Sequence, residues 1–168
     1  NNTASSSDTY NQAGSSILSF IMNGGTLFIN PIDFEDTTFT WFPLDSLVTL
    51  NPNGRLFPGT VIESPVDSNL NLSISHLISV KVKGFWPNVS EFENVQTIYQ
   101  MPVPEGNQPW SGTPTVCSIG QYRVSPIELS GKVVIMTLPL HDGYRPKLQG
   151  NGSAIKLFEY LLENEFIR

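Results

Sequence analysis

The sequence has few charged residues for its length. Lys, Arg, Asp and Glu make up 14% of the 168 residues, against about 25% in an ordinary soluble domain. The net charge is −6. The whole excess of acidic over basic residues lies in residues 1–80, which contain seven acids and one base. Proteins that bind nucleic acid need several Lys or Arg side chains on one face. We therefore expect no nucleic-acid partner.

Cysteine and long apolar runs are also scarce. Cys117 is the only cysteine, so no disulfide can form within the chain. We expect Cys117 to be a small buried hydrophobe in a strand. No apolar run approaches the roughly 18 residues of a membrane-spanning helix, and we expect no direct membrane insertion.

Residues that commonly carry catalysis or bind metals are few. The sequence has two histidines. His76 lies on the same face of a predicted strand as the apolar residues, and His141 is the first residue of a His-Asp-Gly turn. The sequence contains no Gly-x-Ser-x-Gly, no zinc-ligand spacing and no phosphate-binding glycine loop. Asp33, Glu35 and Asp36 resemble a solvated acidic turn rather than a calcium loop. We therefore expect no enzyme, no cofactor and no metal site.

Small polar residues take the place of the missing charges. The chain has 18 Ser, 12 Thr and 14 Asn, with 13 Gly and 13 Pro. Residues 1–16 are polar and without periodicity, which predicts a flexible linker. Residues 17–168 are about the size of one domain, and we expect a single β-rich domain there.

Alternating apolar and polar residues, with turn signals between them, indicate many short strands. This pattern predicts an antiparallel β-sandwich or β-barrel of about nine or ten short strands. Turns are expected at 23–25 and 51–54, and loops at Phe85–Asn94 and Met101–Pro114. The expected strands are Ser16–Met22, Thr26–Asn30, Thr38–Phe42, Ser46–Leu50, Gly59–Glu63, segments within Leu70–Gly84, Val95–Gln100, Thr115–Ile119, Tyr122–Val124 and Lys132–Leu138.

The chain ends with a helical pattern. Ser153–Phe166 predicts one amphipathic helix, with Ser153 as its N-cap. The helix would pack against the sheets or against a neighbouring copy. Its predicted apolar stripe consists of Ile155, Phe158, Leu161, Leu162 and Phe166. Among these, Ile155, Phe158 and Leu162 are candidate residues for an oligomer interface.

Tryptophans beside Pro and Gly mark the two long loops. Trp86 with Asn88, and Gln108 with Trp110, combine an aromatic ring with amide groups. Such pairs suit a ligand or receptor, because a ring can stack while amides form hydrogen bonds. The alternative is that each tryptophan packs beneath its own loop. Trp41 alternates within a strand and is expected in the core.

A polar arm followed by a charge-poor β-domain of about 150 residues resembles the protruding domain of small non-enveloped RNA-virus capsids. Noda-like viruses and bee viruses of the sinaivirus type carry such domains. The resemblance covers the linker at 1–16 and the domain at 17–168. Some insect picorna-like viruses have a proposed Asp–His–Ser cluster in a Trp-His-Ser context. This sequence has only the reversed pair Ser75-His76, so no catalytic residue is carried over.

The resemblance implies a spike on the virion surface. It implies self-association as a dimer or trimer and attachment to a host cell receptor, for which a glycan is a candidate. The alternative is a secreted or cell-surface carbohydrate-binding module, which would be extracellular and monomeric. An enzyme would instead need His76 or His141 to meet a nucleophile and an acid in one cleft.

Overall fold

The computed structural model describes residues 6–30, 42, 44–56, 60–74, 80–101, 113–138, 148–149 and 154–164. Within these ranges the chain is mainly β, with a C-terminal helix, as expected. The elements in chain order are α1 (Ser6–Met22), β1 (Leu27–Ile29), α2 (Leu44–Leu47), β2 (Val48–Leu56), β3 (Val61–Ile62), the 3-10 turn η1 (Ser68–Leu70), β4 (Leu72–Ile74), β5 (Val80–Pro87), β6 (Phe92–Gln100), β7 (Thr115–Ser125), β8 (Glu128–Leu129), β9 (Val133–Met136), β10 (Leu148–Gln149) and α3 (Ala154–Glu163).

The described strands form a large mixed sheet and a small one. The large sheet has seven strands in the order β1-β9-β7-β5-β2, with β6 and β8 paired to β7. β1 and β9 run parallel, so the prediction of a purely antiparallel arrangement is wrong at this pair. A parallel pair needs a long crossover, and most of the chain intervenes between these two strands. β10, β4 and β3 form a second sheet of three strands.

Strand β9 is buried on both of its faces. Val133 and Ile135 contact one hydrophobic cluster, while Val134 and Met136 contact the other. All four side chains are fully buried. A strand covered on both faces has a continuous apolar sequence rather than an alternating one, which explains the run Val-Val-Ile-Met.

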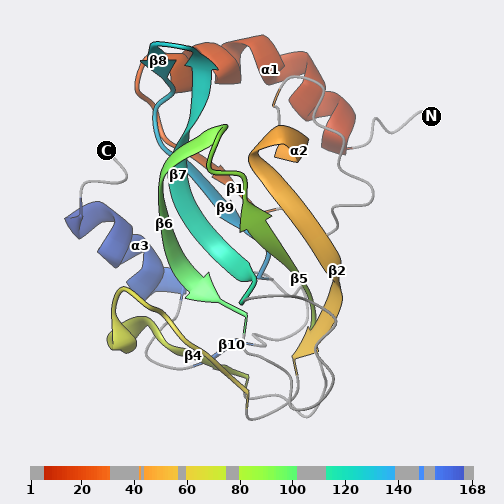
Figure 1. Ribbon diagram of the computed structural model, residues 1–168, viewed down its shortest axis with the longest axis vertical. Helices are drawn as coiled ribbons and strands as arrows, with labels where there is room; N and C mark the ends of the chain where they lie inside the picture. The colour runs from red at the N-terminus through yellow and green to blue at the C-terminus, as the bar shows by residue number, and fades with distance from the viewer. Residues whose placement is uncertain are drawn as a thin grey trace.

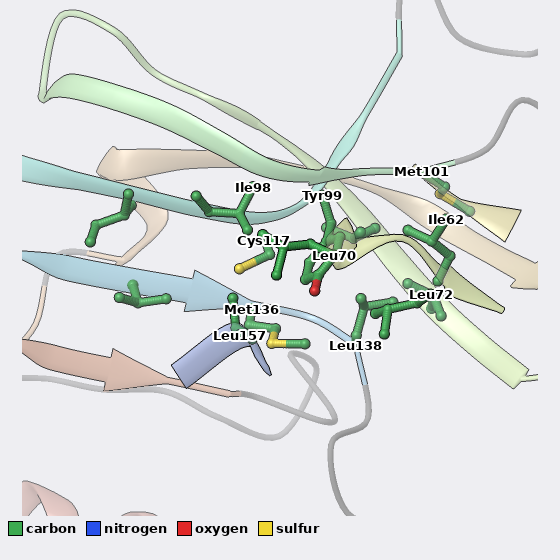
Figure 2. Close-up of a cluster of buried hydrophobic side chains, with 14 of the residues drawn as sticks. Ile62, Leu70, Leu72, Ile98, Tyr99, Met101, Cys117, Met136, Leu138 and Leu157 are labelled. Carbon is green, nitrogen blue, oxygen red and sulfur yellow. The ribbon is translucent and has the colours of Figure 1, made fainter. Parts of the chain in front are cut away.

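The two clusters lie on opposite faces of the large sheet. α1 crosses the end of the sheet near β8, and α3 lies beside β6 (Figure 1). The α1-side cluster contains Ile21, Ile29, Phe42, Leu44, Leu47, Val48, Phe85, Phe92, Tyr122, Val133 and Ile135. The α3-side cluster, shown in Figure 2, contains Ile62, Leu70, Leu72, Val82, Ile98, Tyr99, Met101, Val116, Cys117, Ile119, Val134, Met136, Leu138, Leu157 and Leu161.

Helix α1 replaces the expected strand at Ser16–Met22. It also includes residues 6–16, so the structure places a helix where a linker was expected. Ile17, Leu18, Ile21 and Met22 recur at helical spacing and pack on or within the α1-side cluster. Packing of an apolar face provides most of the stability of such a helix, even though its first half is polar.

The glycines after α1 end a helix rather than turn a hairpin. The Gly24 N–H donates to the carbonyl of Ile21, and the Gly25 N–H donates to that of Phe20. Gly24 has a φ of +86°. These two bonds and the left-handed residue form a Schellman motif, so the predicted turn at 23–25 is a helix cap.

The cap of α1 is joined tightly to the segment before β9. The Gly131 N–H donates to the carbonyl of Ile21 at 2.8 Å. A Cβ atom at Gly131 would lie 2.1 Å from the Gly25 carbonyl oxygen. Glycine is therefore required at 131 because two backbones meet there.

Several other boundaries differ from the predictions. Asn51–Gly54 lies within β2, where the register with β5 shifts between Leu50 and Asn53. Pro52 can occupy a bulge on an edge strand, since it has no N–H to donate.

The strands predicted at Thr115–Ile119 and Tyr122–Val124 form one strand, β7. Gly120 lets that strand continue beneath the ring of Phe92.

We predict that Gly131→Ala destabilises the protein by about 1–3 kcal/mol, because the added methyl group overlaps backbone atoms. Thermal unfolding followed by circular dichroism measures this change. Ile127→Ala serves as the control, because Ile127 is 97% exposed in the turn between β7 and β8. An unchanged unfolding temperature for Gly131→Ala would contradict the close approach.

Candidate functional site

The C-terminal helix α3 exposes one apolar row and buries another. Leu157 and Leu161 are 1% and 0% exposed, whereas Phe158 and Leu162 are 39% and 57% exposed. Residues four apart are neighbours on a helix surface, so each pair forms a short row. The predicted single stripe is therefore divided in the structure: Leu161 is buried beside Leu157, which the predicted stripe did not include, whereas Phe158 and Leu162 are exposed.

The exposed row has a fixed position on the surface. The Phe158 ring packs against the Phe28 ring, with 5.5 Å between their centroids and a tilt of 37°. Leu157 and Leu161 anchor the same helix in the α3-side cluster. Exposed Glu159 lies next to this row, whereas exposed Lys156 and Glu163 lie further round the helix. An apolar row with a charge at its margin is a suitable contact surface for a protein partner.

Trp86 and Asn88 lie at the end of β5 rather than in a long loop. Trp86 is half-buried and pairs with Thr49 of β2. Asn88 is exposed; its Nδ2 donates to the Ser46 carbonyl at 3.0 Å, and its Oδ1 accepts a bond from Ser90 Oγ at 2.8 Å. The prediction of a loop at Phe85–Asn94 is wrong except for residues 88–91, because β5 and β6 extend on either side.

The remaining predicted positions lie outside the described residues. These are Gln108 and Trp110 of the second loop, the two histidines, Trp41, Ser153, Phe166 and the acidic turn at 33–36. For Ile155 only the backbone, within α3, is described. The predictions for these side chains stay predictions.

Cys117 is buried in β7, as predicted. It pairs across the sheet with Tyr99 of β6, and both side chains lie among apolar residues (Figure 2). Burial raises the pKa of the Cys117 thiol far above its ordinary value. Burial, and then the neighbouring Cys117, raise the pKa of Tyr99. The thiol is therefore neutral and shielded, whereas a nucleophilic cysteine needs an accessible thiolate.

The described residues hold no group of three or more His, Cys, Asp or Glu that could bind a metal ion. Among the helices of the described part, none is long and apolar enough to cross a membrane.

Phe20 is a surface residue that the sequence analysis missed. It is 56% exposed near the end of α1, although it was expected within a strand. Its neighbours Ile17 and Ile21 pack on or within the α1-side cluster. The four-residue spacing of Ile17 and Ile21 was the available signal for a helix, but it does not indicate that Phe20 is exposed, because residues three and four apart share a helical face.

Comparison of the chain with known protein families, curated proteins and solved structures gave no match.

We predict that stability falls as the pH rises above about 8.5, the ordinary pKa of a cysteine thiol. The unfolded chain then releases the Cys117 proton, and at higher pH the Tyr99 proton, while the folded chain retains both. Unfolding is favoured under these conditions because the unfolded state binds fewer protons. Unfolding temperatures at pH 7.5 and pH 10 measure the effect.

Cys117→Ala is the matched control, because it removes one of the two groups and should reduce the loss between these pH values. In the unaltered chain, a disulfide reagent at pH 7.5 should react only as fast as the protein unfolds. Rapid labelling of the folded chain would contradict the burial of this thiol.

Proposed function

We propose that this domain is a non-enzymatic attachment and assembly module, and specifically a protrusion on the surface of a viral capsid. In this function, copies associate with one another as dimers or trimers and bind a host cell receptor. The proposal needs no cofactor and no metal. It places the domain at the virion surface.

The observation that carries the proposal is the exposed row of Phe158 and Leu162 on α3. Single exposed apolar residues are normal on protein surfaces. Here two neighbours are held rigidly on a helix that is anchored through Leu157 and Leu161. Burying both against a partner would remove them from water, at roughly 25 cal/mol for each Å² of apolar surface.

A second copy of the chain fits this row as the partner, because the row can pack against itself. When two identical helices pack antiparallel about a two-fold axis, the start of each meets the end of the other. Phe158 of each copy would then meet Leu162 of the other, so that both exposed apolar side chains would be covered.

The surface composition also suits a crowded assembly. Low charge with abundant hydroxyl and amide groups permits contacts between copies without the repulsion of a strongly charged surface. We further infer that the two sheets form the layers of a sandwich. Ile62 and Leu72, from the small sheet, share the α3-side cluster with Cys117 and Met136 of the large one.

A carbohydrate-binding module is the second candidate. It is favoured by the half-buried ring of Trp86 beside the exposed amide of Asn88. In that function the domain would be a monomer, and the sugar would stack on the tryptophan ring. The oligomeric state therefore separates the two candidates.

We predict that Leu162→Asp weakens self-association at least tenfold, which corresponds to about 1.4 kcal/mol. A buried carboxylate would face apolar groups of the partner without a compensating charge. Sedimentation velocity over a range of concentrations measures the change. The folded monomer should be unaffected, because Leu162 is 57% exposed.

Ile127→Asp is the matched control. Ile127 is 97% exposed, in the turn between β7 and β8, away from α3 (Figure 1). This variant should associate like the unaltered chain. If the unaltered chain sediments as a monomer at every concentration, or if Leu162→Asp associates normally, assembly through α3 is refuted.

A further inference from the structure

A cleft lies where α1 ends, beside β8 and the start of β9. Its volume is about 490 Å³, within the range of roughly 300–1,000 Å³ that small-molecule sites occupy. Its lining combines apolar and polar side chains over a floor of glycine backbone. The lining residues are Phe20, Met22, Asn23, Gly24, Gly25, Thr26, Gln121, Leu129, Ser130, Gly131 and Lys132.

Phe20 provides an aromatic surface in this cleft. A Cβ atom at Gly25 would come within 2.4–2.6 Å of three Phe20 ring atoms, so the ring lies directly against the Gly25 backbone. The side chain is nevertheless 56% exposed. The ring is thus supported on one side and open to solvent elsewhere, as a stacking surface requires.

Two amide side chains of the lining are held in fixed orientations. Asn23 Nδ2 donates to the Ser19 carbonyl at 2.8 Å, and its Oδ1 accepts no hydrogen bond from the described residues. Gln121 Nε2 donates to the Ser130 carbonyl at 2.7 Å, while its Oε1 accepts from Asn94 at 3.0 Å. An amide nitrogen carries two hydrogens, so Gln121 keeps one donor. These two side chains therefore contribute one oriented acceptor and one oriented donor to the lining.

The types of side chain in the lining define the class of ligand. Among the described residues, the lining contains no carboxylate, which disfavours a divalent cation. Lys132 is the single charged residue in the described part of the lining, and one positive charge is too little for the several phosphates of a nucleotide. A pyranose ring has a C–H face that packs on an aromatic ring, and it has hydroxyl groups that both donate and accept. It matches the combination of Phe20, Asn23 and Gln121.

We propose that this cleft binds a pyranose unit of a host glycan, and that it is the receptor site of the domain. The inference rests on the proposed function, since attachment requires such a site. It goes further by placing the site at α1 and β8–β9 rather than at Trp86 and Asn88. The Phe20 ring would stack against the sugar, while Asn23 Oδ1 and Gln121 Nε2 would bind its hydroxyl groups.

The test is a glycan array that presents neutral and acidic oligosaccharides, followed by titration of the strongest binder monitored by NMR. We expect Phe20→Ala to weaken binding at least tenfold, with an unchanged unfolding temperature and unchanged sedimentation. Phe20→Tyr keeps the aromatic surface and should retain binding. Phe20→Leu fills similar space without an aromatic face and should lose glycan binding. This second variant tests the stacking role even if the alanine variant folds poorly.

Trp86→Ala and Ile127→Ala are the controls, and both should bind as the unaltered chain does. Loss of binding in Trp86→Ala together with normal binding in Phe20→Ala would overturn the inference and place the sugar at the end of β5. A chain that associates through α3 but binds no glycan would also overturn it, while leaving the assembly function intact. Binding by a chain that stays monomeric would support the cleft and refute assembly.

Discussion

Burial of β9 on both faces is the constraint on which the rest of the structure depends. Because its four side chains alternate between two clusters, both faces of the large sheet must be covered. Helix α1 contributes Ile21 to the cluster on one face, and α3 contributes Leu157 and Leu161 to the cluster on the other. The two helices therefore hold fixed positions at separate places on the surface. Each has one exposed phenylalanine, Phe20 on α1 and Phe158 on α3.

The junction between α1 and the segment before β9 combines backbone hydrogen bonds with those of the buried Ser130 side chain. Ser130 Oγ accepts a bond from the Tyr122 N–H at 3.0 Å and donates to the Gly131 carbonyl at 2.7 Å. Leu27 donates its N–H to the Lys132 carbonyl, which sets the start of the parallel pair. The glycine at 131 lets these two segments approach closely, and residues of the same junction line the cleft. A precise backbone junction is a rigid support for a binding site.

The two proposed surfaces are independent of each other. The α3 row would join copies of the chain, and the cleft at α1 would bind a sugar, so one molecule can do both at once. Multiple copies joined in one assembly would raise the avidity for a glycan surface far above the affinity of one cleft. The buried Cys117 and Tyr99 belong to neither surface, and their raised pKa values reflect burial.

The sequence by itself determined the mainly-β class, the C-terminal helix and the burial of Cys117, because alternation, helical spacing and residue type are local properties. It misplaced Ser16–Met22, Asn51–Gly54 and the loop around Trp86. Short apolar runs fit a strand or a helix equally well, and turn residues can serve as a helix cap or a bulge. The tertiary structure alone decided which row of α3 faces the sheet, that β1 pairs with β9, and that Phe20 lines a cleft. Each of these depends on contacts between residues far apart in the chain, which local patterns do not contain.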